Sequence, residues 1–192
     1  MKKRIAIFAS GSGSNAQKIA EYFKNHPTIE VALVVSNKAD AGVLDIAKSF
    51  GIETYVIPSK AEFTQTETLL QELYVSQIDF IVLAGFLWLI PEYLIEAYPS
   101  RIVNIHPALL PKYGGKGMHG MHVHHAVVAA GEKESGITIH YVDKVYDNGE
   151  HLFQATVPVE PGDTPEVIQQ KVLVLEHTNF AQVIEKVLNT LP

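Results

Sequence analysis

Short apolar runs alternate with amphipathic segments along the first half of the chain. The runs are rich in Val, Ile and Phe, which is typical of strands buried on both faces of a parallel sheet. The runs expected to be strands are KRIAIFA, EVALVVSN, ETYVI, DFIVLAG and RIVNIH. The intervening segments follow the helical period, which predicts helices over SNAQKIAEYFKNH, AGVLDIAKSFG, TQTETLLQELYVSQ and PEYLIEAYP.

The pattern changes after the fifth predicted strand. A long loop and a helix around HVHHAVVAAGE lead to GITIHYVDK and HLFQATVPV, which the turn-rich VYDNGE separates. We expect these two strands to pair antiparallel at the sheet edge. A long last helix should have Thr164 as its N-cap and Pro165 at its first position. The pattern predicts an α/β fold in one domain over residues 1–192: a mostly parallel, Rossmann-like twisted sheet with helices on both faces and an antiparallel edge pair near the C-terminus.

Composition narrows the class of protein. The 192 residues carry a net charge of -6, which offers no basic patch to nucleic acid, so we do not expect a general DNA or RNA binder. The site residues described below make small-molecule substrates the expected partners. No run is long enough for a transmembrane helix, and we expect no membrane contact. The absence of cysteine excludes disulfides and thiolate metal sites, and it fits a cytoplasmic location. The sequence leaves the choice between monomer and homodimer open.

A glycine loop, SGSGSNA, connects the first predicted strand to its helix. It matches the relaxed dinucleotide fingerprint G-x-G-x-x-A, in which backbone N–H groups and the helix dipole attract an anion. Ser14 and Asn15 could add side-chain donors. Asn37 and Lys38 stand where the ribose-binding acid of an NAD site is expected, so we favour a single phosphate over NAD. In the alternative interpretation, the glycines serve only the geometry of a tight turn.

Two polar side chains interrupt the fifth predicted strand. Side chains alternate along a strand, so Asn104 and His106 share one face and Ile105 points to the other. Together they could stabilise an oxyanion, and His106 could also move a proton. Asp147, in the turn of VYDNGE, is a candidate to orient His106 and raise its pKa. The alternative is that the pair caps the strand and satisfies loop carbonyls.

A histidine-rich segment raises the question of a metal site. His122 and His125 share a helix face, whereas His124 points elsewhere, and neither a cysteine nor a nearby acid pair completes a ligand set. We therefore expect His119 and these three histidines to be ordinary loop and helix residues, and no metal to bind; the alternative is that one of them contacts substrate. Thr138 and His140 share a strand face that leads to Asp147, and they could either support it or be plain edge-strand residues.

Four motifs in this order resemble the folate-dependent formyltransferase family: GSGSN, VLAGFLWLIP, NIHPALLPKYGG and GITIHYVDKVYDNGE. The resemblance covers essentially the whole chain and is closest to the branch that formylates glycinamide ribonucleotide in purine biosynthesis. It implies that 10-formyltetrahydrofolate, as co-substrate, gives its formyl group to that amine by direct attack. The chain starts at its first predicted strand and stops after its last predicted helix, so we expect neither the tRNA-binding barrel nor the regulatory domain of other branches.

The resemblance also implies roles for particular residues. Asn104, His106 and Asp147 resemble the family's catalytic trio, in which a protonated His106 supported by Asp147 stabilises the oxyanion and Asn104 gives a second hydrogen bond. The other implied contacts are Gly13, Ser14 and Asn15 for the substrate phosphate; Leu87, Trp88, Leu89, Ile90, Asn104, Asp143, Lys144, Val145, Tyr146 and Asp147 for the folate; and Glu176 for the ribonucleotide.

Other functions stay open from the sequence. The same site could formylate a different amine, such as that of a nucleotide sugar, or hydrolyse the folate. A non-catalytic module that binds a phosphate ligand is a further alternative, although such a module needs only the glycine loop. Trp88 stands where many relatives have Arg, and residues 59–78 contain no Arg, which leaves the folate-tail preference undetermined.

Overall fold

The computed structural model of the protein describes residues 2–191. Its strands are β1 (Lys3–Phe8), β2 (Ile29–Ser36), β3 (Glu53–Val56), β4 (Phe80–Leu83), β5 (Ile102–His106), β6 (Glu134–Tyr141) and β7 (His151–Pro158). Its helices are α1 (Ser14–Phe23), α2 (Gly42–Ser49), α3 (Lys60–Gln65), α4 (Thr68–Val75), α5 (Glu92–Ala97), α6 (Met121–Ala129) and α7 (Pro165–Thr190).

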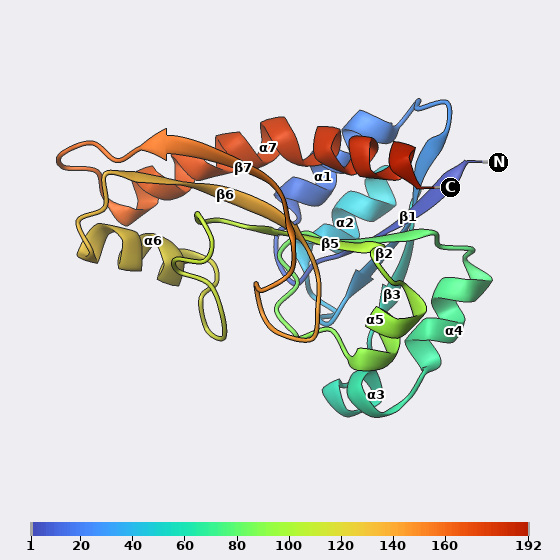
Figure 1. The fold of residues 1–192 in the computed structure, drawn as a ribbon. Helices are drawn as coiled ribbons and strands as arrows, with labels where there is room; N and C mark the ends of the chain where they lie inside the picture. The colour runs from blue at the N-terminus through green and yellow to red at the C-terminus, as the bar shows by residue number, and fades with distance from the viewer. Residues whose placement is uncertain (1, 192) are drawn as a thin grey trace.

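The strands form one sheet in the order β3-β2-β1-β4-β5-β6-β7 (Figure 1). Neighbouring strands from β3 to β5 run parallel, whereas β6 is antiparallel to β5 and β7 to β6. The predicted fold class is therefore confirmed, including the antiparallel edge pair. Strand order reverses direction between β1 and β4, and in open α/β sheets ligands bind beyond the carboxyl ends of the strands at such a point.

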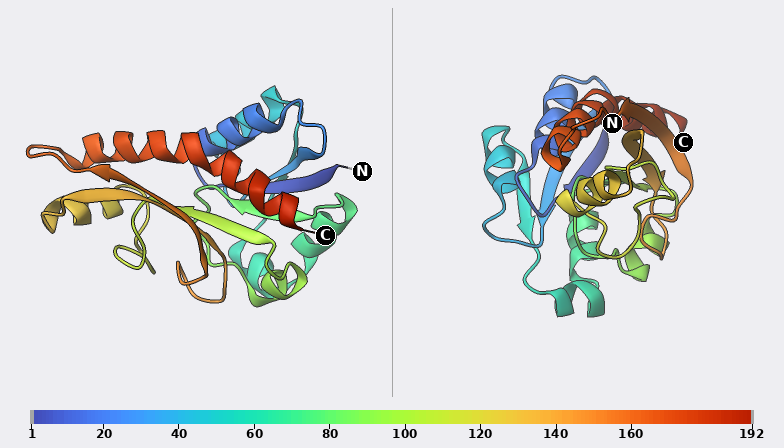
Figure 2. Two further views of the ribbon diagram at one scale, coloured as in Figure 1. Left: turned by 45° about the horizontal axis from the view of Figure 1, so that its top comes forward. Right: turned by 90° about the vertical axis from the view of Figure 1, so that its left-hand side faces the viewer.

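Helices cover both faces of the sheet (Figures 1 and 2). Alternate residues of β1 explain why. Ile5 and Ile7 pack with α1, α2 and α7, while Ala6 and Phe8 pack with α3, α4 and α5, and all four side chains are fully buried. A central strand with apolar residues on both faces can be buried only between two helical layers. The same alternation places Asn104 and His106 on the face that carries Ile102.

The helix predicted over TQTETLLQELYVSQ begins too early: α4 covers Thr68–Val75, whereas Thr64 and Gln65 end a separate helix, α3, most of which was not predicted. Thr66 ends α3 with an extended backbone (φ -127°, ψ 157°), and its hydroxyl donates to the carbonyl oxygen of Glu62. Threonine competes in this way with the helical hydrogen bonds of its own backbone. The start of α3 had a sequence signal: Ser59 is its N-cap and accepts from the N–H of Glu62, the first half of a capping box.

The last helix, α7, begins as predicted and extends along both the parallel strands and the antiparallel pair β6–β7. The side chain of Thr164 accepts a hydrogen bond of 3.4 Å from the N–H of Val167, and Pro165 lies in the first turn. Along its 26 residues α7 contacts two helices, α1 and α6, and three strands, β5, β6 and β7. Among the helices of residues 2–191, none is both long and apolar enough to cross a membrane.

Candidate active site

A cavity of about 490 Å³ opens at the carboxyl ends of β4 and β5. Three loops surround it: residues 85–90 after β4, residues 115–120 before α6, and residues 143–147 between β6 and β7. One side of α7 closes the remaining wall through Gln169 and Glu176, of which the sequence had singled out only Glu176. The position fits the general rule for parallel α/β sheets.

Most residues with an implied role line this cavity. They are Asn15, Leu87, Trp88, Leu89, Ile90, Asn104, His106, Asp143, Val145, Tyr146, Asp147 and Glu176. Gly13, Ser14 and Lys144 do not line it. The Lys144 ammonium instead forms an ion pair with Glu92 on α5, with both side chains exposed to solvent. Sequence reasoning missed Gln169 and Leu173, which also line the wall; their spacing to Glu176 along one helix face could have indicated them.

The loop between β6 and β7 folds back tightly and so carries Asp147 to the end of β5. Gly149 lies against the backbone of Tyr141, where a Cβ would approach the carbonyl oxygen within 1.8 Å. Asp147 itself has a positive φ of 53°, which Asp tolerates better than most residues. The Asp143 carboxylate accepts from the N–H of Val145 and from the side-chain amide of Asn148, both at 2.8 Å. Asp143 therefore organises the loop internally.

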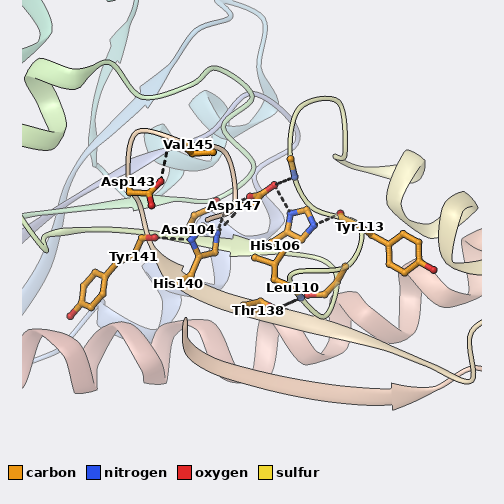
Figure 3. A network of polar contacts seen from close by, with 12 residues as sticks. Asn104, His106, Leu110, Tyr113, Thr138, His140, Tyr141, Asp143, Val145 and Asp147 are labelled. Carbon is orange, nitrogen blue, oxygen red and sulfur yellow. Dashed lines mark hydrogen bonds and ion pairs between the residues drawn. The ribbon is translucent and has the colours of Figure 1, made fainter. Parts of the chain in front are cut away.

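The Asp147 carboxylate joins the polar side chains at the end of β5 (Figure 3). Its Oδ2 lies 3.5 Å from Nδ1 of His106 and accepts a 2.8 Å hydrogen bond from the backbone N–H of Gly115. Its Oδ1 lies 3.5 Å from Nδ2 of Asn104 and 3.6 Å from Nε2 of His140. The structure thus brings together the three side chains that the sequence singled out.

Hydrogen bonds determine the neutral form of His106. Its Nε2 lies 2.8 Å from the carbonyl oxygen of Tyr113. A carbonyl can only accept, so Nε2 carries the hydrogen and Nδ1 has the lone pair. Nδ1 faces Asp147, and a second proton therefore binds there, between the ring and the carboxylate. Asp147 is positioned to stabilise the charged imidazolium.

Burial and charge act in opposite directions on this pair. Burial lowers the pKa of His106 below its ordinary value, and the Asp147 carboxylate and the Tyr113 carbonyl only partly oppose it. Asp147 thus raises the pKa of His106 as expected, but the side chain is only 4% exposed, so desolvation dominates and the net pKa is lowered. Burial also raises the pKa of Asp147, but the contacts with His140, His106 and Gly115 outweigh it, and the net pKa is lowered.

The structure distinguishes His140 from Thr138. His140 pairs with Asn104 across β5 and β6, and its Nε2 lies 3.1 Å from Nδ2 of Asn104. Its Nδ1 donates to the carbonyl oxygen of Tyr141 at 2.7 Å, so in the neutral ring Nε2 accepts from Asn104. Thr138 instead donates to the carbonyl oxygen of Ala108 and supports the loop after β5. His140 therefore orients Asn104, whose side-chain amide lies 3.5 Å from Oδ1 of Asp147, whereas Thr138 has a structural role.

The glycine loop has features of a tight turn that requires glycine and also features of an anion-binding site, the two interpretations made from the sequence. Gly13 has a φ of 83°, and a Cβ there would lie 2.7 Å from Cβ of Val43, so packing against α2 alone requires glycine. Gly13 is also the N-cap of α1. Because glycine has no side chain, the N–H groups of the first turn have no side-chain acceptor from the N-cap residue. Next to it, Nδ2 of Asn15 donates to Glu176 at 2.6 Å. Burial raises the pKa of the Glu176 carboxyl, and the Asn15 hydrogen bond only partly offsets this.

The histidines of the loop and of α6 do not converge. The His119 and His122 rings lie edge to face with centroids 5.6 Å apart, while His124 is buried on another side of α6. Across residues 2–191, no group of three or more His, Asp or Glu side chains is placed to hold a metal ion. His124 lines the cavity, and its Nδ1 is buried with no hydrogen-bond partner.

Comparison with known proteins identifies the family. The formyl transferase family model matches residues 3–184. Over 188 residues the chain is 43% identical to a chloroplastic phosphoribosylglycinamide formyltransferase of Arabidopsis thaliana, covering 95% of this chain and 64% of that protein. A Vigna unguiculata relative of the same name is 42% identical, and the chain covers 60% of it. The chain thus spans about six-tenths of the length of these plant relatives.

Bacterial relatives match along nearly their whole length. The phosphoribosylglycinamide formyltransferase of Bacillus subtilis is 35% identical, covering 97% of this chain and 95% of that one. The crystal structure of phosphoribosylglycinamide formyltransferase from Bacillus halodurans superimposes with a TM-score of 0.87 at 37% identity, covering 98% of this chain and 96% of that chain. Family model, sequence and fold agree over the same residues, and the chain belongs to the formyl transferase family.

Proposed function

We propose that the protein transfers the formyl group of 10-formyltetrahydrofolate to the amine of glycinamide ribonucleotide. The observation that carries the proposal is the contact of Asn104, His106 and Asp147 at one end of a cavity of about 490 Å³. Relatives named phosphoribosylglycinamide formyltransferase support the choice of acceptor. A cytoplasmic location, as expected from the composition, stays a prediction.

The reaction requires charge stabilisation and one proton transfer. The amine nitrogen attacks the formyl carbon, a new C–N bond forms, and the carbonyl oxygen becomes an oxyanion. The positive charge of protonated His106 and an N–H of the Asn104 amide stabilise that oxyanion. The bond from the formyl carbon to N10 then breaks, and the proton lost by the amine goes to N10, with His106 as the relay. Asp147 stabilises the imidazolium form of His106, which is regenerated when the proton of the amine replaces the one given to N10.

The cavity walls suggest where each substrate binds. The backbone of Leu87–Ile90 and the loop Asp143–Asp147 would hold the pterin of the folate between them. The segment after β4 is fixed by Ser10, whose hydroxyl accepts from the N–H of Leu87 at 3.1 Å. The ribonucleotide phosphate would lie at the N-terminus of α1, beside Ser14 and Asn15, with Glu176 near its ribose. These two placements bring amine and formyl group together next to His106.

The test follows the absorbance of 10-formyltetrahydrofolate as it loses its formyl group, with and without glycinamide ribonucleotide. Turnover that requires the acceptor is expected and would support the proposal. Turnover without acceptor would replace it with a hydrolase. No turnover with either would contradict it, and a panel of other amines, including a nucleotide sugar, would then identify a different acceptor. His106→Ala, purified in parallel, controls for contaminating activity.

A further inference from the structure

Tyr113 contacts His106 with its main chain and Glu132 with its side chain. The carbonyl oxygen accepts from Nε2 of His106 at 2.8 Å, and the phenol hydroxyl donates to Oε1 of Glu132 at 2.8 Å. Glu132 lies in the turn between α6 and β6, outside the cavity wall. A carboxylate remote from the cavity is therefore connected to the imidazole through one residue.

We propose that Tyr113 and Glu132 are positioning residues that determine which nitrogen of His106 carries its proton. The inference rests on the proposed function, because the tautomer of His106 matters to catalysis only if His106 takes part in it. The side chains of Tyr113 and Glu132 do not contact the side chains of Asn104, His106 or Asp147. Both act through the backbone carbonyl of Tyr113.

The backbone at Tyr113 needs a restraint. Its φ is 56°, a left-handed conformation that costs conformational free energy for a tyrosine. The next residues, Gly114 and Gly115, are glycines, and they provide little resistance to rotation. The phenol is therefore the anchor. Its ring packs at the edge of the core between the sheet and α7, and its hydroxyl is held by Glu132.

The same short segment holds both members of the His106–Asp147 pair. Tyr113 binds Nε2 of His106 through its carbonyl, and two residues later the N–H of Gly115 donates to Oδ2 of Asp147 at 2.8 Å. Gly114, between them, lies so close to Asp147 that an added Cβ would be 3.2 Å from its Cβ. A shift of Tyr113 therefore changes the support of the imidazole and the position of the carboxylate together.

Loss of the carbonyl contact would change the chemistry of the ring. With Nε2–H donated to Tyr113, the second proton binds at Nδ1 and faces Asp147. Without that acceptor, the neutral ring can place its hydrogen on Nδ1, and the second proton then binds Nε2, away from the carboxylate. Asp147, His140 and His124 are the titratable groups whose charges bear on the His106 ring, and Tyr113 adds its carbonyl. That carbonyl raises the pKa of His106.

The test compares Tyr113→Phe and Glu132→Ala with a matched control, Lys112→Met. Lys112 donates to the same oxygen of Glu132 at 2.9 Å but has no contact with His106. We expect kcat to fall about fivefold or more in the first two variants, the size of one lost hydrogen bond, with KM for both substrates within about twofold of wild type. The high-pH limb of the kcat profile should move to lower pH. Lys112→Met should resemble wild type.

Two further variants separate positioning from general damage. Tyr113→Phe/Glu132→Ala should be no slower than the slower single variant, because both changes remove one hydrogen bond. Glu132→Gln keeps an acceptor oxygen and should recover most of the rate. Wild-type kcat in Tyr113→Phe, additive losses, or a lower kcat with an unmoved pH limb would overturn the proposal.

An NMR measurement keeps this proposal distinct from the proposed function. The ¹⁵N shifts of His106 report its tautomer and its pKa in the resting protein, without turnover. We expect Nε2–H in wild type and Lys112→Met, and a mixed or reversed tautomer with a lower pKa in Tyr113→Phe. An unchanged tautomer would overturn the positioning role even if the enzyme transfers formyl groups. An absent transferase activity with the tautomer change intact would contradict the proposed function alone.

Discussion

His124 should make the protein markedly less stable in mild acid. Its side chain is 2% exposed, and burial, followed by the positive charges of His106 and His125, lowers its pKa from 6.5 to about 4. The unfolded chain therefore binds a proton at a pH where the folded protein does not. The contribution of neutral His124 to the free energy of unfolding is fully present above the unfolded pKa of about 6.5 and is lost as the pH falls towards 4.

The size of the effect follows from the two pKa values. Between pH 7 and pH 5, a histidine that shifts from 6.5 to about 4 removes about 2 kcal/mol from the free energy of unfolding. Urea denaturation at both pH values measures that change, with the fluorescence of the single tryptophan, Trp88, as the signal.

Other groups also titrate in this range, so the comparison is between variants. His124→Leu removes the proton-binding group. Its free energy of unfolding should therefore fall by about 2 kcal/mol less than that of wild type between pH 7 and pH 5. His125→Leu, on the exposed side of the same helix, should behave as wild type does. Equal losses in wild type and His124→Leu would refute the assigned burial of a neutral imidazole.

Three further outcomes follow from the site and its support. His106→Ala should lower kcat by about 100-fold or more, since it removes an oxyanion partner and the proton relay; a loss below about tenfold would contradict that role. Asp147→Asn removes the carboxylate that raises the pKa of His106, so the high-pH limb of the rate profile, where protonated His106 is lost, should move to lower pH; an unmoved limb would argue against the pairing. Gly13→Ala should lower the free energy of unfolding by about 1–3 kcal/mol more than Gly51→Ala does, because its Cβ would lie 2.7 Å from Cβ of Val43, whereas Gly51 has the same sign of φ but open space around it. Urea denaturation of both variants measures the difference, and equal losses would contradict the steric argument.

The fold was largely predictable because short apolar runs typical of buried strands alternate clearly with segments that follow the helical period. Fully apolar strands such as Phe80–Leu83 have no stable place except between two helical layers, and the turn-rich VYDNGE marks the antiparallel pair. The interruption at Thr66 was not predicted, because a polar gap such as TQTET, residues 64–68, does not by itself mark the end of a helix. It depends instead on a side-chain hydrogen bond to the carbonyl of Glu62, and periodicity does not contain that information.

The candidate site was predictable where it depends on strand alternation and less so where it depends on tertiary contacts. Asn104 and His106 interrupt an apolar strand, which is visible in the sequence. The role of His140 depends on the register that pairs it with Asn104, and the sequence does not fix that register. For the pKa of His106, the raising effect of Asp147 was predicted but the larger lowering effect of burial was not, because a charge partner can be inferred from motifs whereas the depth of burial requires the packed structure.

The length of α7 has a consequence for how the molecule unfolds. Buried residues occur from Ile168 near its start to Leu188 near its end, and it packs on the parallel strands and on the antiparallel extension alike. Neither part can detach without exposing the apolar face of this helix to water, so the two parts should melt in one cooperative transition. Hydrogen exchange should then show similar protection in β5 and β6. The loops around the cavity can fluctuate, but the distance between the parts that carry them stays fixed until global unfolding.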